Sequence, residues 1–113
     1  MSELAKKHCV PCRGGVPPLK GKAISELLSQ IDRAWRVVGE HHIERRFTFA
    51  DFASSMAFAG EIGDLAEREG HHPDLLVRWG ELLVTLSTHK ANGLTESDFV
   101  LAAKIDELAA DST

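Results

Sequence analysis

The hexapeptide FTFADF at residues 47–52 decides how the rest of the chain is organised, because its pattern returns as LTESDF at residues 94–99. In each copy a threonine is followed three residues later by an aspartate, which is typical of a capping box at the N-terminus of a helix. Apolar residues on both sides are placed for the hydrophobic staple that accompanies such a box. We therefore predict that Thr48 caps a helix ending at Gly70, and that the second copy opens the last helix.

Two strand-like runs precede each copy of this pattern. The predicted strands are residues 35–38, 43–47, 75–79 and 81–89, with turns at residues 39–42 and near Gly80. Before them, apolar residues at three- and four-residue spacing over 23–31 predict a short amphipathic helix. The predicted order is α-β-β-α-β-β-α: an α+β fold in which a four-stranded antiparallel sheet has three helices packed on one face.

A chain of 113 residues has room for one domain. Residues 1–22 are rich in proline and glycine and are interpreted as an irregular N-terminal arm, and residues 23–113 as the domain. Cys9 and Cys12 have the spacing of a zinc-binding pair, but no second pair follows, so an arm with two thiols is the preferred interpretation. Sheet edges in so small a domain also invite pairing with another copy, and we expect an oligomer.

The bulk composition excludes several classes of partner. A net charge of -4 gives no basic face for nucleic acid. No apolar run approaches the roughly 20 residues needed to cross a bilayer, so no membrane partner is expected. The first residues contain no apolar segment of a secretory signal, and two cysteines then suggest a reducing compartment. We expect a cytoplasmic protein.

A dense cluster of titratable side chains follows the helix that begins at the first hexapeptide. Glu67 lies four residues before His71, so the two side chains can share one face of the helix. Pro73 favours an extended backbone at His72. His89 ends the last predicted strand on the face away from the core. If that strand lies beside the turn, the three histidines border one cleft.

Histidine exchanges protons near neutral pH, so three imidazoles can protonate a leaving hydroxyl and also accept a proton, without a metal. One alternative is a zinc site formed by Glu67, His71 and His89. Another is that these side chains only satisfy the ends of helices and strands, but their grouping favours chemistry. The similar pair at residues 41–42 lies in a predicted turn, where a solvated surface position is the simpler interpretation.

At these residues the chain resembles the pterin-4a-carbinolamine dehydratase family. The family pattern is an acidic residue, three residues, His-His-Pro, then an aromatic, a histidine ten positions after it and a later aspartate. The matching positions are Glu67, residues 71–73, Trp79, His89 and Asp98. The resemblance extends over roughly residues 23–110. It implies a subunit with three helices against a four-stranded antiparallel sheet, in a homodimer or homotetramer.

The resemblance also implies an activity. Family members dehydrate 4a-hydroxytetrahydropterin to quinonoid dihydropterin, which recycles the pterin after aromatic amino-acid hydroxylation. No cofactor is expected, because the pterin is the substrate. The implied catalytic residues are His71, His72 and His89; the implied substrate-binding residues are Glu67, Gly70, Pro73, Ser87, Thr88 and Asp98. For Asp98, the capping box is an alternative explanation.

Three positions depart from the family pattern. Gly70 stands where Asp or Asn is frequent, Leu75 where an aromatic is frequent, and Lys90 where an acidic residue is frequent. These changes reduce the polar and stacking surface for a pterin ring. They also motivate an alternative function, a non-catalytic dehydratase-like dimerisation cofactor or assembly chaperone.

Overall fold

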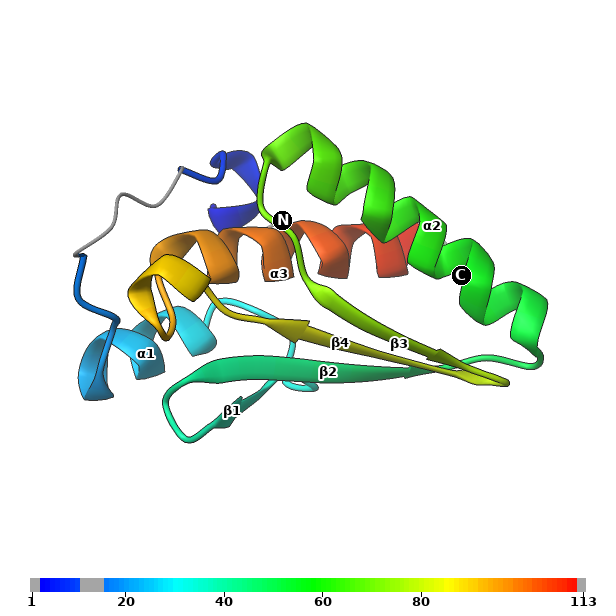
Figure 1. Ribbon diagram of the computed structural model, residues 1–113, viewed down its shortest axis with the longest axis horizontal. Helices are drawn as coiled ribbons and strands as arrows, with labels where there is room; N and C mark the ends of the chain where they lie inside the picture. The colour runs from blue at the N-terminus through cyan, green and yellow to red at the C-terminus, as the bar shows by residue number, and fades with distance from the viewer. Residues whose placement is uncertain (1–2, 11–15, 112–113) are drawn as a thin grey trace.

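The computed structural model describes residues 3–10 and 16–111. Within these residues the chain forms three α-helices, four β-strands and two short 3₁₀ turns, in the predicted order (Figure 1). Their bounds are η1 Leu4–Lys6, α1 Gly21–Leu28, β1 Arg36–Val38, β2 His42–Thr48, α2 Phe52–Glu69, β3 Asp74–Arg78, β4 Glu81–Leu86, η2 His89–Ala91 and α3 Glu96–Asp111. The predicted α+β fold class is confirmed.

The sheet has the order β1-β2-β4-β3, and all three neighbouring pairs are antiparallel. The two hairpins are joined through β2 and β4, where Ile43 lies opposite Leu86 and Thr48 opposite Glu81. Along β4, residues alternate between buried and half-buried positions. One face of the sheet is therefore covered, as the predicted alternation of Leu82, Val84 and Leu86 requires.

The helices cover this buried face. Figure 1 shows α2 and α3 running across one side of the sheet. Helix α2 contacts β3, β4 and α3, while α1 packs against α3. Phe99 and Ile105 of α3 are fully buried, as are Leu82 and Val84 of β4. The helices and the sheet thus share one hydrophobic core, and the prediction that the helices lie on one face is confirmed.

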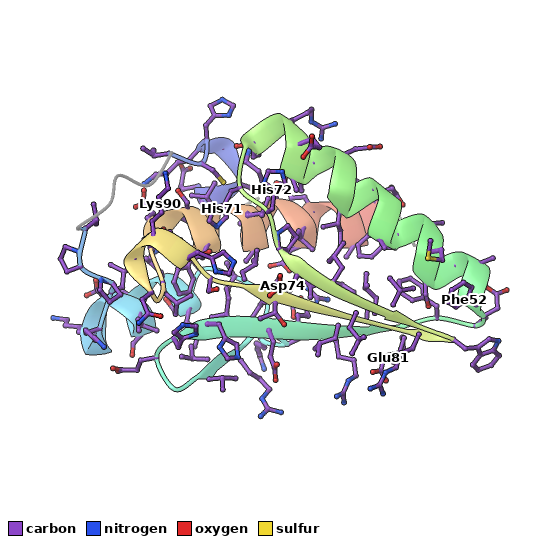
Figure 2. The ribbon with its side chains drawn as sticks, in the orientation of Figure 1. Phe52, His71, His72, Asp74, Glu81 and Lys90 are labelled. Atoms are coloured by element: carbon purple, nitrogen blue, oxygen red, sulfur yellow. The ribbon has the colours of Figure 1, made fainter. Side chains whose placement is uncertain are left out.

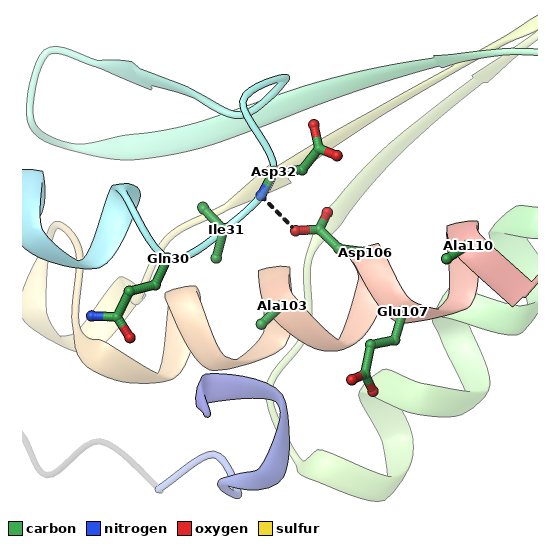
Figure 3. Close-up of a pocket in the computed structure, with 7 residues that line it drawn as sticks. All are labelled: Gln30, Ile31, Asp32, Ala103, Asp106, Glu107 and Ala110. Atoms are coloured by element: carbon green, nitrogen blue, oxygen red, sulfur yellow. Dashed lines mark hydrogen bonds between the residues drawn. The ribbon is translucent and has the colours of Figure 1, made fainter. Parts of the chain in front are cut away.

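Asp106 of α3 ties the link between α1 and β1 to the core. Its carboxylate accepts hydrogen bonds from the Asp32 N–H (2.9 Å, Figure 3) and the Trp35 Nε1–H (2.7 Å), and it pairs with Arg45 Nη1 (2.5 Å). Burial raises the pKa of Asp106, although these three partners oppose the shift. A cavity of about 280 Å³ lies beside this junction, with Ile31 among its lining residues (Figure 3).

The predicted start of α2 is wrong by three residues. Thr48 is the last residue of β2, and Asp51 is the N-cap, with its carboxylate accepting a hydrogen bond from the Ser54 N–H (2.8 Å). This hydrogen bond lowers the pKa of Asp51. Aspartate is itself a strong N-cap residue, so strand β2 can extend through the threonine. The predicted end is confirmed: Gly70 has a φ of +66°, in the left-handed region.

The last strand is shorter than predicted. Strand β4 ends at Leu86, and His89 begins the turn η2 instead of ending the strand. Thr88 and Gly93 exchange hydrogen bonds across this turn, with N···O distances of 2.7 and 3.3 Å. The physical reason is a lack of partners: the pairing of β3 with β4 extends only to Thr85, and that of β2 only to Leu86.

Smaller boundary differences concern the other elements. The first helix begins at Gly21 and ends at Leu28, and β1 begins one residue after Trp35. The first hairpin turn comprises residues 39–41, because His42 already belongs to β2. Strand β3 ends at Arg78, so Trp79 lies in the turn and is 72% exposed.

Part of the predicted arm packs against the domain. Leu4 and Ala5 of η1 are 2% and 6% exposed, and Lys104 Nζ of α3 donates a hydrogen bond to the Ala5 carbonyl (2.7 Å). The domain boundary near residue 22 stays a prediction. Cys12 lies outside the described residues. Among the helices in the described ranges, none is both long and apolar enough to span a membrane.

Candidate active site

A cavity of about 330 Å³ lies where α2 ends, β3 begins and β4 leads into η2. Its lining residues are Gly70, His71, His72, Ser87, Thr88, His89 and Lys90. Figure 2 shows the labelled His71, His72 and Lys90 close to one another and far from Phe52. Two distant stretches of the sequence, 70–72 and 87–90, therefore meet in one place.

His71 is held by a buried carboxylate. Its Nε2 lies 2.6 Å from Oδ1 of Asp98, whose side chain is fully buried in the first turn of α3. Gly70 makes this contact possible, because its left-handed backbone turns the chain away from α2 immediately before the histidine. The sequence interpretation allowed Glu67 and His71 to share one helical face, but in the structure His71 pairs with Asp98.

Asp98 has two further partners. Its Oδ2 accepts hydrogen bonds from the Thr88 hydroxyl (2.8 Å) and the Thr95 N–H (2.9 Å). A capping box contains a hydrogen bond from the backbone N–H of the cap residue to the side chain three residues later. The bond from the Thr95 N–H to Asp98 is this one, so this part of the predicted box is confirmed. The Thr95 and Thr88 hydroxyl oxygens lie 2.9 Å apart. Since the Thr88 proton goes to Asp98, Thr95 donates to Thr88. One carboxylate thus caps α3 and orients two residues of the cavity.

Glu67 pairs with His72 instead of His71. The Glu67 Oε2 lies 2.5 Å from His72 Nε2, and both side chains are largely exposed. The sequence had placed Glu67 and His71 on one helical face, but Gly70 ends the helix between them. After that break, the second histidine of the pair reaches back to the last turns of α2.

The two carboxylates define which ring nitrogen of each histidine bears a proton. A carboxylate oxygen only accepts, so the Nε2 of His71 and of His72 is the protonated nitrogen in each pair. In the neutral ring, Nδ1 is then the nitrogen with a free lone pair. Each of these imidazoles can accept a proton on Nδ1, and the paired carboxylate stabilises the imidazolium that results.

His89 enters the cavity from the other stretch of sequence. It is an exposed residue at the start of η2, next to Ser87 and Thr88, which also line the cavity. The predicted convergence of three histidines is observed, although the strand expected to place His89 ends three residues earlier. The bridge between Thr88 and Gly93 fixes the turn that contains it.

Two of the predicted substrate-binding residues, Glu67 and Asp98, act on lining histidines without lining the cavity. Pro73 does not line it either. Lys90, named in the sequence only as a departure from the family pattern, is a lining residue, and the sequence interpretation missed Thr95 as a partner of Thr88. The signal for Lys90 was its place directly after His89; the signal for Thr95 was its place in the capping pattern.

The N-terminal arm contacts the same two helix ends from outside the cavity. The Cys9 N–H donates to Glu69 Oε1 (3.0 Å), and the Val10 N–H donates to the Ser97 hydroxyl (2.9 Å). Burial raises the pKa of the Cys9 thiol to about 12, and the nearby Glu69 charge adds to this. Burial alone would raise the pKa of Glu69, but the Cys9 N–H and the Lys104 charge lower it overall.

The zinc alternative at Glu67, His71 and His89 gains no ligand set among the described residues, and the Cys9–Cys12 pair stays untested because Cys12 lies outside them. In the part of the chain that the structure describes, no three or more histidine, cysteine, aspartate or glutamate side chains are grouped to hold a metal ion. Glu67 and His71, two of the three ligands of the zinc alternative, each pair with a different side chain.

The second histidine pair, at residues 41–42, is separate from the cavity. His41 is exposed, and its Nε2 lies 3.2 Å from Asn92 Oδ1.

Comparison with known proteins gives consistent matches. A model of the family described as "Pterin 4 alpha carbinolamine dehydratase" matches residues 17–108. Two relatives named "Putative pterin-4-alpha-carbinolamine dehydratase" come from Rubrobacter xylanophilus and Alkaliphilus metalliredigens. The first is 54% identical over 108 residues, covering 96% of this chain and 100% of the relative. The second is 50% identical over 107 residues, covering 95% and 96%.

Two solved structures are also similar. The first, a transcriptional coactivator/pterin dehydratase from Brucella melitensis, has a TM-score of 0.74 and 35% identity; the match covers 80% of this chain and 97% of that one. The second is a pterin dehydratase-like protein identified as a RuBisCO assembly factor in the alpha-carboxysome. Its TM-score is 0.58 and its identity 28%, with 68% of this chain and 90% of that chain covered.

Proposed function

The chain belongs to the pterin 4a-carbinolamine dehydratase family, and on this basis we propose that it removes water from a 4a-hydroxytetrahydropterin to give the quinonoid dihydropterin. The single observation that best supports this activity is the convergence of His71, His72 and His89 on one cavity. Two of these histidines also have a carboxylate partner. This arrangement suits proton transfer in both directions near neutral pH.

The proposed reaction needs one proton donor and one proton acceptor. The C4a–O bond breaks, a proton leaves N5, a C4a=N5 double bond forms, and the hydroxyl departs as water after it gains a proton. An imidazole backed by a carboxylate can take the N5 proton on Nδ1, and a second imidazole in its cationic form can protonate the hydroxyl. We assign this exchange to His71, His72 and His89 together. The pterin is the substrate, and we propose no metal or other cofactor.

The remaining predicted residues have supporting roles in this proposal. Ser87 and Thr88 line the cavity and offer hydroxyl groups to a polar ring. Gly70 leaves the wall beside His71 without a side chain, so a flat ring can approach the backbone. Glu67 and Asp98 hold His72 and His71. Pro73 acts on the pterin only indirectly, because it restricts the backbone that follows the histidine pair.

The activity is tested by the turnover of chemically generated carbinolamine near neutral pH. We expect His72→Ala and His89→Ala to lose roughly two orders of magnitude or more of the enzymatic rate, the usual contribution of general acid–base catalysis. His8→Ala is the matched control, because His8 is 85% exposed on the arm and does not line the cavity. A wild-type protein no faster than the two site variants would overturn the proposal.

The setting we propose for this activity is pterin recycling in the cytoplasm, beside an aromatic amino-acid hydroxylase that produces the carbinolamine. We also propose a homodimer or homotetramer, with no nucleic acid or membrane partner. Large apolar side chains on the surface support self-association: Phe52, Met56, Leu76 and Trp79 are between 45% and 72% exposed. Light scattering after size-exclusion chromatography tests this; a monomer at micromolar concentration would contradict it.

A second candidate function is a non-catalytic assembly factor or dimerisation cofactor. The similar structure identified as a RuBisCO assembly factor motivates this alternative. A pull-down from the source cell that returned a stoichiometric partner, bound equally by the wild type and by His72→Ala and His89→Ala, would favour it. Retention of the three cavity histidines favours the dehydratase.

A further inference from the structure

Lys90 gives the proposed active site a positive charge that the acid–base mechanism does not use. It lines the cavity together with the three histidines. Figure 2 shows Lys90 near His71 and His72 and far from Phe52. None of the cavity's lining residues is a carboxylate. A ligand in this cavity would therefore meet an ammonium group without a neighbouring acid on the wall.

Two of the three histidines that line the cavity have a carboxylate partner, whereas Lys90 has none among the described residues. His71 pairs with Asp98 and His72 pairs with Glu67, so each has a carboxylate of its own. Across the described ranges, the Lys90 ammonium has no ion pair or hydrogen bond. Lysines elsewhere do find such partners: Lys104 contacts Glu69 and the Ala5 carbonyl.

This local charge contrasts with the charge of the whole chain. The net charge is -4, so a general excess of lysine does not explain a cation at the site. An acidic protein repels anions on average, and an anionic substrate would gain most from a cation placed at the cavity itself. The turn holding Lys90 is fixed by the Thr88–Gly93 bridge and by Asn92 in the left-handed region, so the lysine backbone has a defined place.

We propose that Lys90 makes the site selective for pterins with a negatively charged substituent on the ring, either a carboxylate or a phosphate ester. The pterin ring system is neutral near pH 7, so a charge that Lys90 can recognise must lie on the substituent. A substituent with only hydroxyl groups would leave the ammonium without a counter-charge. This inference rests on the proposed dehydratase activity and adds the class of substrate to it.

The test compares three carbinolamine substrates with neutral, carboxylate and phosphate side chains: those of 6-methyltetrahydropterin, a 6-carboxyalkyl tetrahydropterin and the phosphate ester of 6-hydroxymethyltetrahydropterin. We expect Lys90→Gln to lower kcat/KM for the anionic substrates about five- to tenfold, as for loss of one partly exposed charge contact. Lys90→Glu should lower it further, and the neutral substrate should change less than about twofold. The two anionic substrates tell which anion is preferred.

Salt and a matched surface lysine provide the controls. The wild-type KM for the anionic substrates should rise with salt, and this dependence should weaken in Lys90→Gln, because exposed charges are screened over about 10 Å at 0.1 M salt. Lys22→Gln should leave all substrates unchanged, because Lys22 is 89% exposed on α1 and pairs with Glu26.

Binding separates this inference from the catalytic proposal. Pterin-6-carboxylate and 6-methylpterin can be titrated by their own fluorescence, without turnover. Equal kcat/KM for neutral and anionic substrates, together with an unchanged Lys90→Gln profile, would overturn the inference and leave the dehydratase activity intact. Absence of turnover with all three substrates would overturn the dehydratase proposal, and equal binding of the two pterins by the wild type would then overturn this inference as well.

Discussion

At the scale of single residues, Asp98 shows how one side chain can have two explanations that are both correct. Its sequence position predicts a helix cap, and the structure gives it that role through the Thr95 N–H. The same carboxylate holds Nε2 of His71 and the hydroxyl of Thr88, and it is fully buried. A cap need not be buried, so complete burial beside an imidazole is the feature that marks Asp98 as part of the site.

Asp98→Asn tests this second role. The amide keeps the size of the carboxylate, but it removes the negative charge that stabilises imidazolium at His71. We expect kcat for the dehydration to fall at least tenfold, with a smaller change in KM, because Asp98 holds His71 but does not itself line the cavity. Steady-state kinetics and a thermal melt check this.

A loss of stability alone would lower the melting temperature without changing kcat of the folded enzyme. Asp51→Asn is the matched control, since Asp51 caps α2 at the end of the helix away from the cavity. An Asp98→Asn enzyme with an unchanged kcat would show that the carboxylate serves only the helix.

The sequence predicted that the three histidines would meet in one cavity, but it did not predict which carboxylate each of them would pair with. The spacing of Glu67 and His71 is that of neighbours on a helix, and the sequence interpretation relied on it. Gly70 breaks the helix between them, so His71 turns towards α3 and His72 towards Glu67. The glycine was recognised as a helix end, but the direction taken by the chain after it depends on the packing of α3.

At the scale of elements, the strand ends were predicted to within one residue, except for the end of β4. The apolar alternation stops at Leu86, but Ser87 and His89 continue the opposite face of the predicted strand, so the sequence interpretation extended the strand to His89. The strand ends where its neighbours end, since hydrogen bonding to β2 and β3 stops at residues 85–86. Strand length is a property of the pairing, and the alternation of one strand contains no information about its neighbours.

Gly93 leaves no room for a side chain beside Pro18, in the segment before α1. A Cβ at residue 93 would lie 2.6 Å from the Cβ of Pro18, which is too close for any pair of carbon atoms. We expect Gly93→Ala to lower the free energy of unfolding by about 1–3 kcal/mol, as for other overpacked sites. Chemical denaturation measures this change.

The comparison variant is Gly60→Ala, in the middle of α2, where an added Cβ meets no atom within 4 Å. This change should stabilise the protein by up to about 1 kcal/mol, because alanine is the better helix former. Equal and small effects at both positions would mean that residues 17–20 do not pack against the turn η2.

At the scale of the whole molecule, the two repeated hexapeptides predicted the order of elements and the single layer of helices. The contribution of residues 3–10 was not predictable, because proline and glycine around them suggest an irregular arm. Two apolar residues, Leu4 and Ala5, are enough to join the core. Short apolar segments have no periodicity of their own, so their burial depends on the surface that α3 offers them.

Glu69 makes the packing of this arm dependent on pH. The carboxylate is 9% exposed, and its folded-state pKa lies below its usual value because the Cys9 N–H and the Lys104 charge outweigh burial. A lowered carboxyl pKa contributes stability that is complete above the usual glutamate value near 4.3 and is lost as the pH falls through the folded-state pKa. We expect the wild type to be more stable than Glu69→Gln at pH 7, with the difference shrinking below about pH 4.

Denaturation curves between pH 3 and 7 measure this difference. Glu26→Gln is the control, since Glu26 is 65% exposed on α1, and its effect should be small across the range. A difference between wild type and Glu69→Gln that stays constant down to pH 3 would contradict the assignment.

The contact between Gly93 and Pro18 also has an evolutionary meaning. Because any side chain at position 93 would occupy the space of the Pro18 ring, neither residue can change freely while the other remains. A lineage that replaces the glycine must first lose or move the proline, so the two positions are expected to covary among descendants of a common ancestor. The turn beside the cavity and a segment near the start of the chain would then change together during evolution, at a rate different from that of the histidines.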